Sequence, residues 1–327
     1  MKFERLFLVA FVGSVMNLQA MPAKSQDYPT RPITFIVPLP PGGTLDPASR
    51  VITGKLADRL GKPIVIKNQP GAGTVVGTEA AARATPDGYT MLMGGTAGLA
   101  VNVRLFRKLP YDPVTDFEPV ALVLRIPFIL VVHPSLPVHS VFDLIKLARE
   151  KPGQLFYASA GIGTQPHLAM ELLKTITGIE MIHVPYRGAM IGLADVLTGQ
   201  PQVIFADPAS ALPLVREGKL RALGVSSAVR VPIAPDIPPI ADAGFPGFEA
   251  VVWIMIVAPA NTPRRIVNRL HDEIKAIMRL PDVKERIVSL GVVPVDSPPP
   301  ERLGDFLKSE IERWGRLVEQ AGIAGSQ

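Results

Sequence analysis

Short runs rich in valine and isoleucine alternate along this chain with longer amphipathic segments. That alternation is typical of an α/β fold, in which mixed, mostly parallel sheets are flanked by helices. We expect strands at residues 33–37, 64–67, 90–93, 121–124, 129–132, 156–158, 181–184, 203–206, 222–225 and 254–258. We expect helices at residues 48–60, 77–84, 141–150, 167–177, 188–197, 209–217, 264–280, 281–289 and 302–321.

The first residues of the chain have the pattern of a secretory signal peptide. Lys2 and Arg5 precede an apolar run at residues 6–15, and small residues near positions 20 and 25 offer cleavage sites. A membrane anchor is the weaker interpretation, because the run is shorter than the roughly 20 residues that span a bilayer. We therefore expect residues 1–25 to be removed and the protein to be periplasmic.

The length of the chain predicts two lobes. About 300 residues would remain after cleavage, which is more than one hydrophobic core usually holds. The chain has no cysteine, so each lobe would depend on its core rather than on disulfides. Breaks in the pattern near residues 125 and 250 predict a two-strand hinge, with residues 26–125 and 251–327 in the first lobe and 126–250 in the second. Two sequential domains are the alternative.

Composition and spacing argue against several classes of ligand. The formal net charge of +5 is mild and spread along the chain, so nucleic-acid binding is not indicated. The five histidines lack the spacing of a metal site, and we expect no metal. The segment 71–77 follows a strand, but its third glycine comes one residue later than in a dinucleotide-binding loop. We expect no cofactor, and Gly73 to lie in a turn that faces the cleft.

Two glycine-rich turns each follow an expected strand and precede an expected helix. The first is PLPPGGTLD at residues 38–46, and the second is SAGIGT at residues 159–164. Such a unit directs free backbone N–H groups and a helix N-terminus at one point, where an anion can bind. Either turn alone is more simply a tight turn. The pair predicts two lobes that close on one acidic ligand.

Eight short motifs occur along the chain in an order that resembles the Bug family, the extracytoplasmic solute receptors of tripartite tricarboxylate transporters. They are YPTRPI (28–33), PLPPGGTLD (38–46), NQPGAG (68–73), PDGYT (86–90), LPYDP (109–113), SAGIGT (159–164), HVPYRG (183–188) and GKLRAL (218–223). The resemblance covers essentially the whole mature chain. It implies a two-lobed periplasmic-binding-protein fold of a type II-like kind. It also implies a receptor, not an enzyme, that delivers a small organic acid to membrane permease subunits.

The resemblance also implies which residues contact the ligand. By position in the motifs these are Pro40, Gly42, Gly43 and Thr44 of the first lobe and Ser159, Gly161, Gly163 and Thr164 of the second. His167 follows the second turn closely and is a further candidate, although packing against its own helix is the simpler interpretation. Tyr186 is within reach of a carboxylate or is a packing ring.

Two further candidates mark departures from the family pattern. Leu39 stands where the family usually has phenylalanine, so one wall of the pocket would be wider or softer. Asp207 stands at the position of an asparagine. If its side chain faces the cleft, it would repel a carboxylate or accept a hydrogen bond from an ammonium or hydroxyl group. A helix N-cap before Pro208 is the favoured alternative for Asp207.

Two other functions stay open at this point. A secreted hydrolase or transferase would use the glycine turns as an oxyanion or phosphate site. A receptor of the same fold would instead dock, loaded with its ligand, on the ectodomain of a membrane sensor.

Overall fold

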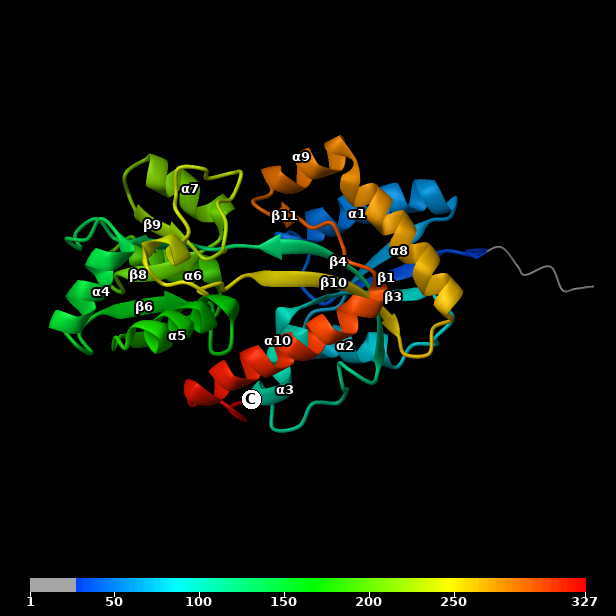
Figure 1. The fold of residues 1–327 in the computed structure, drawn as a ribbon, viewed down its shortest axis with the longest axis horizontal. Coiled ribbons are helices and arrows are strands. Elements are labelled where there is room, and N and C mark those ends of the chain that lie inside the picture. Colours follow the sequence, from blue (N-terminus) through cyan, green and yellow to red (C-terminus); the bar gives the residue numbers. More distant parts are fainter. Residues whose placement is uncertain (1–27) are drawn as a thin grey trace, which may run out of the picture.

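Two β-sheets, each covered by helices, form two lobes in the computed structural model, which describes residues 28–327 (Figure 1). The sheet of the first lobe has the order β11-β4-β10-β3-β1-β2. Its strands are β1 (Ile33–Val37), β2 (Ile64–Asn68), β3 (Thr90–Gly95), β4 (Phe117–Ile126), β10 (Val252–Pro259) and β11 (Val293–Pro294). The sheet of the second lobe has the order β7-β6-β8-β5-β9. Its strands are β5 (Ile129–Val132), β6 (Phe156–Ser159), β7 (Ile182–Pro185), β8 (Val203–Ala206) and β9 (Arg221–Val225).

Helices follow most of these strands. Those of the first lobe are α1 (Leu45–Leu60), α2 (Val75–Ala82), α3 (Asn102–Leu105), α8 (Arg264–Arg279), α9 (Pro281–Ser289) and α10 (Pro300–Gln320). Those of the second are α4 (Val141–Glu150), α5 (Gln165–Thr177), α6 (Ala189–Val196) and α7 (Pro208–Arg216). Single turns of tighter or wider helix occur at η1 (Ala72–Thr74), η2 (Ala97–Val101) and η3 (Ile240–Ala243).

Helix α8 shows why these segments fold as they do. Ile266, Leu270, Ile274 and Ile277 are buried and lie three or four residues apart, so they form one apolar stripe against the sheet. The stripe packs with strand residues of the first lobe in one core cluster. Burial of this stripe therefore fixes the helix on the sheet.

The two sheets are mixed, and parallel pairing occupies one end of each. β1 pairs in parallel with β2 and β3, while β10 runs antiparallel to β3 and β4. In the second sheet β6 pairs in parallel with β7 and β8, while β5 runs antiparallel to β8 and β9. The sequence predicted that parallel strands would predominate, and in the structure they do not. The strands that link the lobes pair antiparallel because the chain leaves on one and returns on its neighbour.

The chain passes between the two sheets twice. It leaves the first sheet at the end of β4, Ile126, and enters the second at Ile129; it returns from β9 to β10 at Val252. β4 and β10 pair along the whole length of β10 and lie side by side where the lobes join (Figure 1). The predicted signal peptide, residues 1–25, lies outside the described residues. Among residues 28–327, no helix is both long and apolar enough to cross a bilayer.

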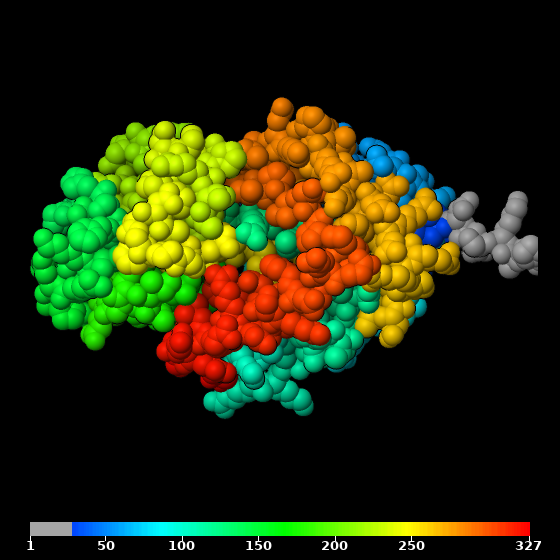
Figure 2. Space-filling view, viewed as in Figure 1, coloured from blue at the N-terminus to red at the C-terminus, as the bar shows by residue number. Residues whose placement is uncertain are grey.

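Helix α10 contacts both lobes. It packs on β4 and α3 of the first lobe and on α5 of the second, and it crosses the visible face of the molecule toward the second lobe (Figure 2). Trp253 of β10 and Trp314 of α10 are both buried. Their indole N–H groups donate to the same oxygen of Glu310, at 2.7 and 2.8 Å. This shared acceptor fastens α10 to the return strand.

Candidate functional site

Two neighbouring cavities lie where the lobes meet. The first, the Gln165 cavity, has a volume of about 290 Å³ and brings Leu39, Gly73 and Thr74 of the first lobe together with residues 162–165 of the second. The second, the Asp207 cavity, has a volume of about 230 Å³ and brings Pro40, Gly43, Thr44 and Asp46 together with Asp207. Both cavities are lined by Leu39, Leu45, Val252 and Ile254. They therefore share one apolar wall.

The first glycine turn carries its own carboxylate. Asp46, in the first turn of α1, is 7% exposed and accepts hydrogen bonds from Arg50, Asn68 and, at 3.4 Å, the N–H of Gly42. The hydrogen bond from Arg50 is the main reason that the pKa of this carboxyl is lowered. Gly42 has φ +86° and lines neither cavity, so its role is to shape the turn.

The segment that contains Gly73 also reaches the Gln165 cavity. Gly73 and Thr74 have φ +58° and +81°, and the amide of Asn102 donates to the carbonyl of Gly73 at 2.9 Å. A positive φ is costly for a residue with a branched side chain, so this turn is held in a strained conformation. Thr74 is among the residues that line this cavity.

The second glycine turn is bonded within itself. The N–H of Gly161 donates to Ser159 Oγ at 3.1 Å, and the N–H of Gly163 donates to His167 Nδ1 at 3.1 Å. Ser159 Oγ also lies 2.6 Å from His183 Nε2. The N–H groups that the sequence assigned to a ligand are therefore engaged by side chains of the second lobe in this structure.

His183 and His167 hold this turn through their hydrogen bonds to Ser159 and Gly163. Their rings stack with centroids 4.0 Å apart, and the ring of Tyr157 stacks on His183 at 4.9 Å. Burial lowers the pKa of His183 to about 4 and lowers that of His167 as well, so both rings are neutral near pH 7. His167 lines neither cavity and holds the backbone of Gly163 in place.

Tyr186 also lies behind the turn. Its hydroxyl donates to Asp195, its N–H donates to the carbonyl of Ser159 at 3.0 Å, and it lines neither cavity. Burial and the carboxylate of Asp195 raise the pKa of its phenol to about 12. Tyr186 is therefore a packing ring here, which is one of the two interpretations that the sequence allowed.

Asp207 lines the smaller cavity between the lobes. It occupies the N-cap position of α7, but its side chain accepts no capping hydrogen bond from that helix. The N-cap position that the sequence favoured for Asp207 is therefore confirmed, although without a side-chain capping bond, and the residue also lines the Asp207 cavity. Burial raises the pKa of Asp207.

Several cavity residues were not predicted, among them Leu105, Gln165 and Thr74. Leu105 of α3 lies against Gly163 of the opposite lobe, and a Cβ atom at Gly163 would overlap its side chain. Gln165 and Thr74 complete the polar lining. Gln165 directly follows the SAGIGT motif, so its place at the first position of a helix is a signal that the sequence itself carries.

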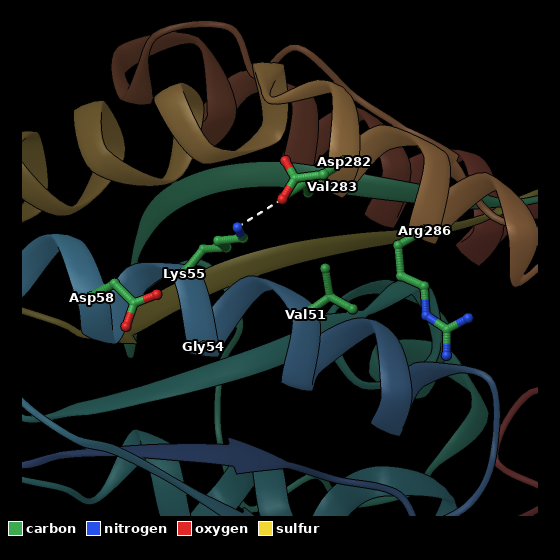
Figure 3. Close-up of a pocket in the computed structure, with 7 residues that line it drawn as sticks. All are labelled: Val51, Gly54, Lys55, Asp58, Asp282, Val283 and Arg286. Carbon is green, nitrogen blue, oxygen red and sulfur yellow. Dashed lines mark ion pairs between the residues drawn. The ribbon is translucent and has the colours of Figure 1, made fainter.

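A larger cavity, of about 380 Å³, lies on the outside of the first lobe between α1 and α9 (Figure 3). Lys55 of α1 and Asp282 of α9 form an ion pair at 2.7 Å across it (Figure 3). None of the predicted site residues lines this cavity. Among residues 28–327 no group of three acidic or histidine side chains is placed to hold a metal ion.

The model of the tripartite tricarboxylate transporter family receptor matches residues 48–323 of the chain. The chain belongs to this family. It is 38% identical to a UPF0065 protein in the tcbD-tcbE intergenic region of Pseudomonas sp. strain P51, over 98% of this chain and 95% of that relative. It is 36% identical to the family protein BugT of Bordetella pertussis, over 98% of this chain and 99% of BugT.

Solved receptor structures share the fold. The structure of R. palustris Rpa4515 with adipate matches with a TM-score of 0.79 at 36% identity and covers 91% of this chain and 99% of its own. The structure of MatC from Rhodopseudomonas palustris with bound malate matches with a TM-score of 0.74 at 33% identity and covers 89% and 100%. The periplasmic binding protein BugD matches with a TM-score of 0.75 at 30% identity and covers 91% and 99%. The two-lobed α/β fold and the family resemblance predicted from the sequence are confirmed.

Proposed function

We propose that this protein is a periplasmic receptor that binds a small carboxylic acid between its lobes and delivers it to the permease subunits of a tripartite tricarboxylate transporter. The observation that carries the proposal is the pair of cavities at the junction of the lobes, in a chain of this receptor family. Related structures that hold adipate and malate support an organic acid as the ligand.

The proposed lobes keep the boundaries expected from the sequence, residues 26–125 with 251–327 and residues 126–250. The proposed direct contacts are Leu39, Pro40, Gly43, Thr44, Gly73, Gly163, Thr164 and Asp207, which line the two cavities. Gly42, Ser159, Gly161, His167 and Tyr186 hold the turns in position from outside the cavities. Export with cleavage near residues 20–25 belongs to the same proposal.

Binding is favoured over turnover by the position of Ser159. Its Oγ is 2.6 Å from His183 Nε2, a spacing that a nucleophile and its general base would have. Its side chain is fully buried, however, and it lines neither cavity. A hydroxyl without access to the ligand supports a structural role, and a receptor explains the site better than a hydrolase.

Native mass spectrometry of protein taken from the periplasm tests whether an acid is retained. Isothermal titration with linear and aromatic acids then measures affinity, and Ile162→Asp with Ile176→Asp forms a matched pair. Both isoleucines are about two-fifths exposed, at 42% and 41%, but only Ile162 lines the Gln165 cavity. A new carboxylate at Ile162 should weaken binding at least about tenfold by charge repulsion, while Ile176→Asp leaves it unchanged. The proposal fails if no acid is retained or bound, or if the two variants behave alike.

A further inference from the structure

The Gln165 cavity holds two buried polar groups that lack partners. Gln165 is 8% exposed, and its side-chain Nε2 has no hydrogen-bond partner within residues 28–327. Thr74, from the opposite lobe, also lines the cavity, and its Oγ1 has no partner among these residues either. Leaving such groups unpaired costs about 1–3 kcal/mol each, so both are poised to bind a ligand atom. An amide N–H and a hydroxyl both donate to a carboxylate oxygen.

The rest of the cavity lining limits the chemistry of the ligand beyond its carboxylate. Met93, Val101, Leu105 and Ile162 line the Gln165 cavity, and Val252 and Ile254 continue the apolar wall into the Asp207 cavity. Among residues 28–327, no lysine, arginine or histidine lines either cavity. The body of the ligand therefore meets apolar surface, and a second carboxylate would meet no basic side chain.

The Asp207 cavity determines which chemical group the ligand carries at the end opposite its carboxylate. It is lined by two carboxyl groups, of which Asp46 is satisfied by Arg50 and Asn68. Asp207 accepts no side-chain capping bond and lines the cavity, so its carboxyl group is available to a hydrogen-bond donor of the ligand. A ligand carboxylate placed here would be repelled by both acids.

The helices that begin at this cavity favour a hydroxyl over an ammonium group as the ligand's donor to Asp207. Thr44 and Asp207 are the N-caps of α1 and α7, so both helices direct the positive end of their dipole toward it. That field disfavours a ligand cation. A hydroxyl donates to Asp207 and is neutral, so it satisfies both conditions.

We propose that the ligand is a carboxylic acid with an apolar body and a hydroxyl group at its far end, the carboxylate bound by Gln165 and Thr74 and the hydroxyl by Asp207. This inference rests on the proposed function and names the class of acid that the same cleft accepts. It separates this receptor from one built for a dicarboxylate.

Two matched series of acids test the proposal by isothermal titration. Hexanoate, 6-hydroxyhexanoate, 6-aminohexanoate and adipate differ only at the far end, and so do benzoate, 4-(hydroxymethyl)benzoate, 4-(aminomethyl)benzoate and terephthalate. In at least one series the hydroxy acid should bind tightest, about tenfold better than the dicarboxylate and the unsubstituted acid. A preference for the amino acid in both series would overturn the hydroxyl assignment.

Variants locate the two ends of the ligand. Asp207→Ala should remove the advantage of the hydroxy acid over the unsubstituted acid, and Asp207→Asn should improve binding of the dicarboxylate. Gln165→Leu should weaken every acid about tenfold and leave their order unchanged. Asp58→Asn, at an exposed residue of α1 that lines only the outer cavity, is the control and should change nothing. Circular dichroism melts check that each variant is folded.

If the dicarboxylate binds tightest in both series, or if the order is unchanged in Asp207→Ala, the inference is wrong while the receptor function stands. Binding of none of the eight acids also overturns it; an acid of another class retained from the periplasm would then still support the receptor function. Absence of both binding and retention overturns the two together.

Discussion

The two glycine turns share a plan of strand, turn and helix, but their amide groups do different things. In the first turn Gly42 and Gly43 are exposed, and the Gly42 N–H donates to the side chain of Asp46 at 3.4 Å. In the second turn Gly163 is buried, and Ser159 and His167 hold the amides of Gly161 and Gly163 at 3.1 Å. The first turn is thus open to the cleft, whereas the second is a preformed wall. The same sequence pattern therefore forms an adaptable turn in the first lobe, the open turn, and a fixed one in the second lobe, the rigid turn.

The largest expected effect comes from adding a methyl group to the rigid turn. Gly163→Ala and Gly42→Ala both place alanine at a positive φ, +76° and +86°, so they share a backbone cost of about 1 kcal/mol. Only at Gly163 does the new Cβ overlap Leu105 of the other lobe; at Gly42 it meets open space. Urea unfolding should show a loss of about 3 kcal/mol for Gly163→Ala and about 1 kcal/mol for Gly42→Ala.

A double variant sharpens this test. Leu105→Ala in the Gly163→Ala background removes the overlapping side chain, so the two changes should be less harmful together than their sum. Equal losses for the two glycine variants, or strict additivity of the pair, would show that the lobes do not meet at this point.

In the open turn, the expected effect of Asp46→Ala is smaller. The substitution leaves Arg50, Asn68 and Gly42 without their acceptor and should lower the free energy of unfolding by about 2 kcal/mol at pH 7. Because the pKa of Asp46 is lowered on folding, its contribution is present above its unfolded pKa of about 3.9 and is lost as the pH falls through its folded value. Asp58→Ala, at an exposed position on the same helix, is the control. A difference between the two variants that does not shrink as the pH is lowered would contradict this account.

Acid should also weaken the rigid turn, starting at a higher pH than in the open turn. The pKa of His183 is lowered to about 4 on folding, so the unfolded chain binds more protons between about pH 6.5 and pH 4. Stability is therefore lost as the pH falls through this window. Thermal melts of His183→Gln should show a loss that is smaller than the wild-type loss by an amount on the order of 1 kcal/mol. Identical acid profiles for the two proteins would remove His183 from the support of the turn.

The smallest expected effect concerns Asp207, which lines the same cavity as Gly43 and Thr44 of the open turn. Its pKa is raised on folding, so ionisation favours the unfolded chain, and stability falls as the pH rises from about 3.9 through the folded value. Asp207→Asn should therefore stabilise the ligand-free protein at pH 7, by about 0.5–1 kcal/mol, with the gain vanishing near pH 3. Differential scanning calorimetry at both pH values measures it, and a loss of stability at pH 7 would show that Asp207 has a partner in the folded protein.

The sequence predicted the strands well because each is a short apolar run between turn residues. Ile33–Val37, Ile129–Val132 and Val203–Ala206 begin and end where expected. The segment from η2 into α3 was missed because Ala97–Val101 is apolar without the period of an ordinary helix. Its absence from the prediction also hid Leu105, the residue that meets Gly163.

Contacts between residues far apart in the sequence determine the features of the site that the motifs do not predict. The motifs located both turns, but whether an amide faces a ligand or a neighbouring side chain depends on partners far along the chain. His183 reaches Ser159 from the next strand, and Thr74 shares a cavity with Gln165 only once the lobes meet. For Asp207 the sequence left both a cleft residue and an N-cap open, and in the fold it occupies the N-cap position of α7 and also lines the cavity.

The bond that Trp253 and Trp314 share at Glu310 gives the protein a built-in optical reporter. These are the only two tryptophans in the chain, and both lie where the return strand meets the helix that contacts both lobes. Their emission therefore comes from the junction and from nowhere else in the molecule. Movement of one lobe against the other can be followed in solution by intrinsic fluorescence, with no dye and no engineered cysteine.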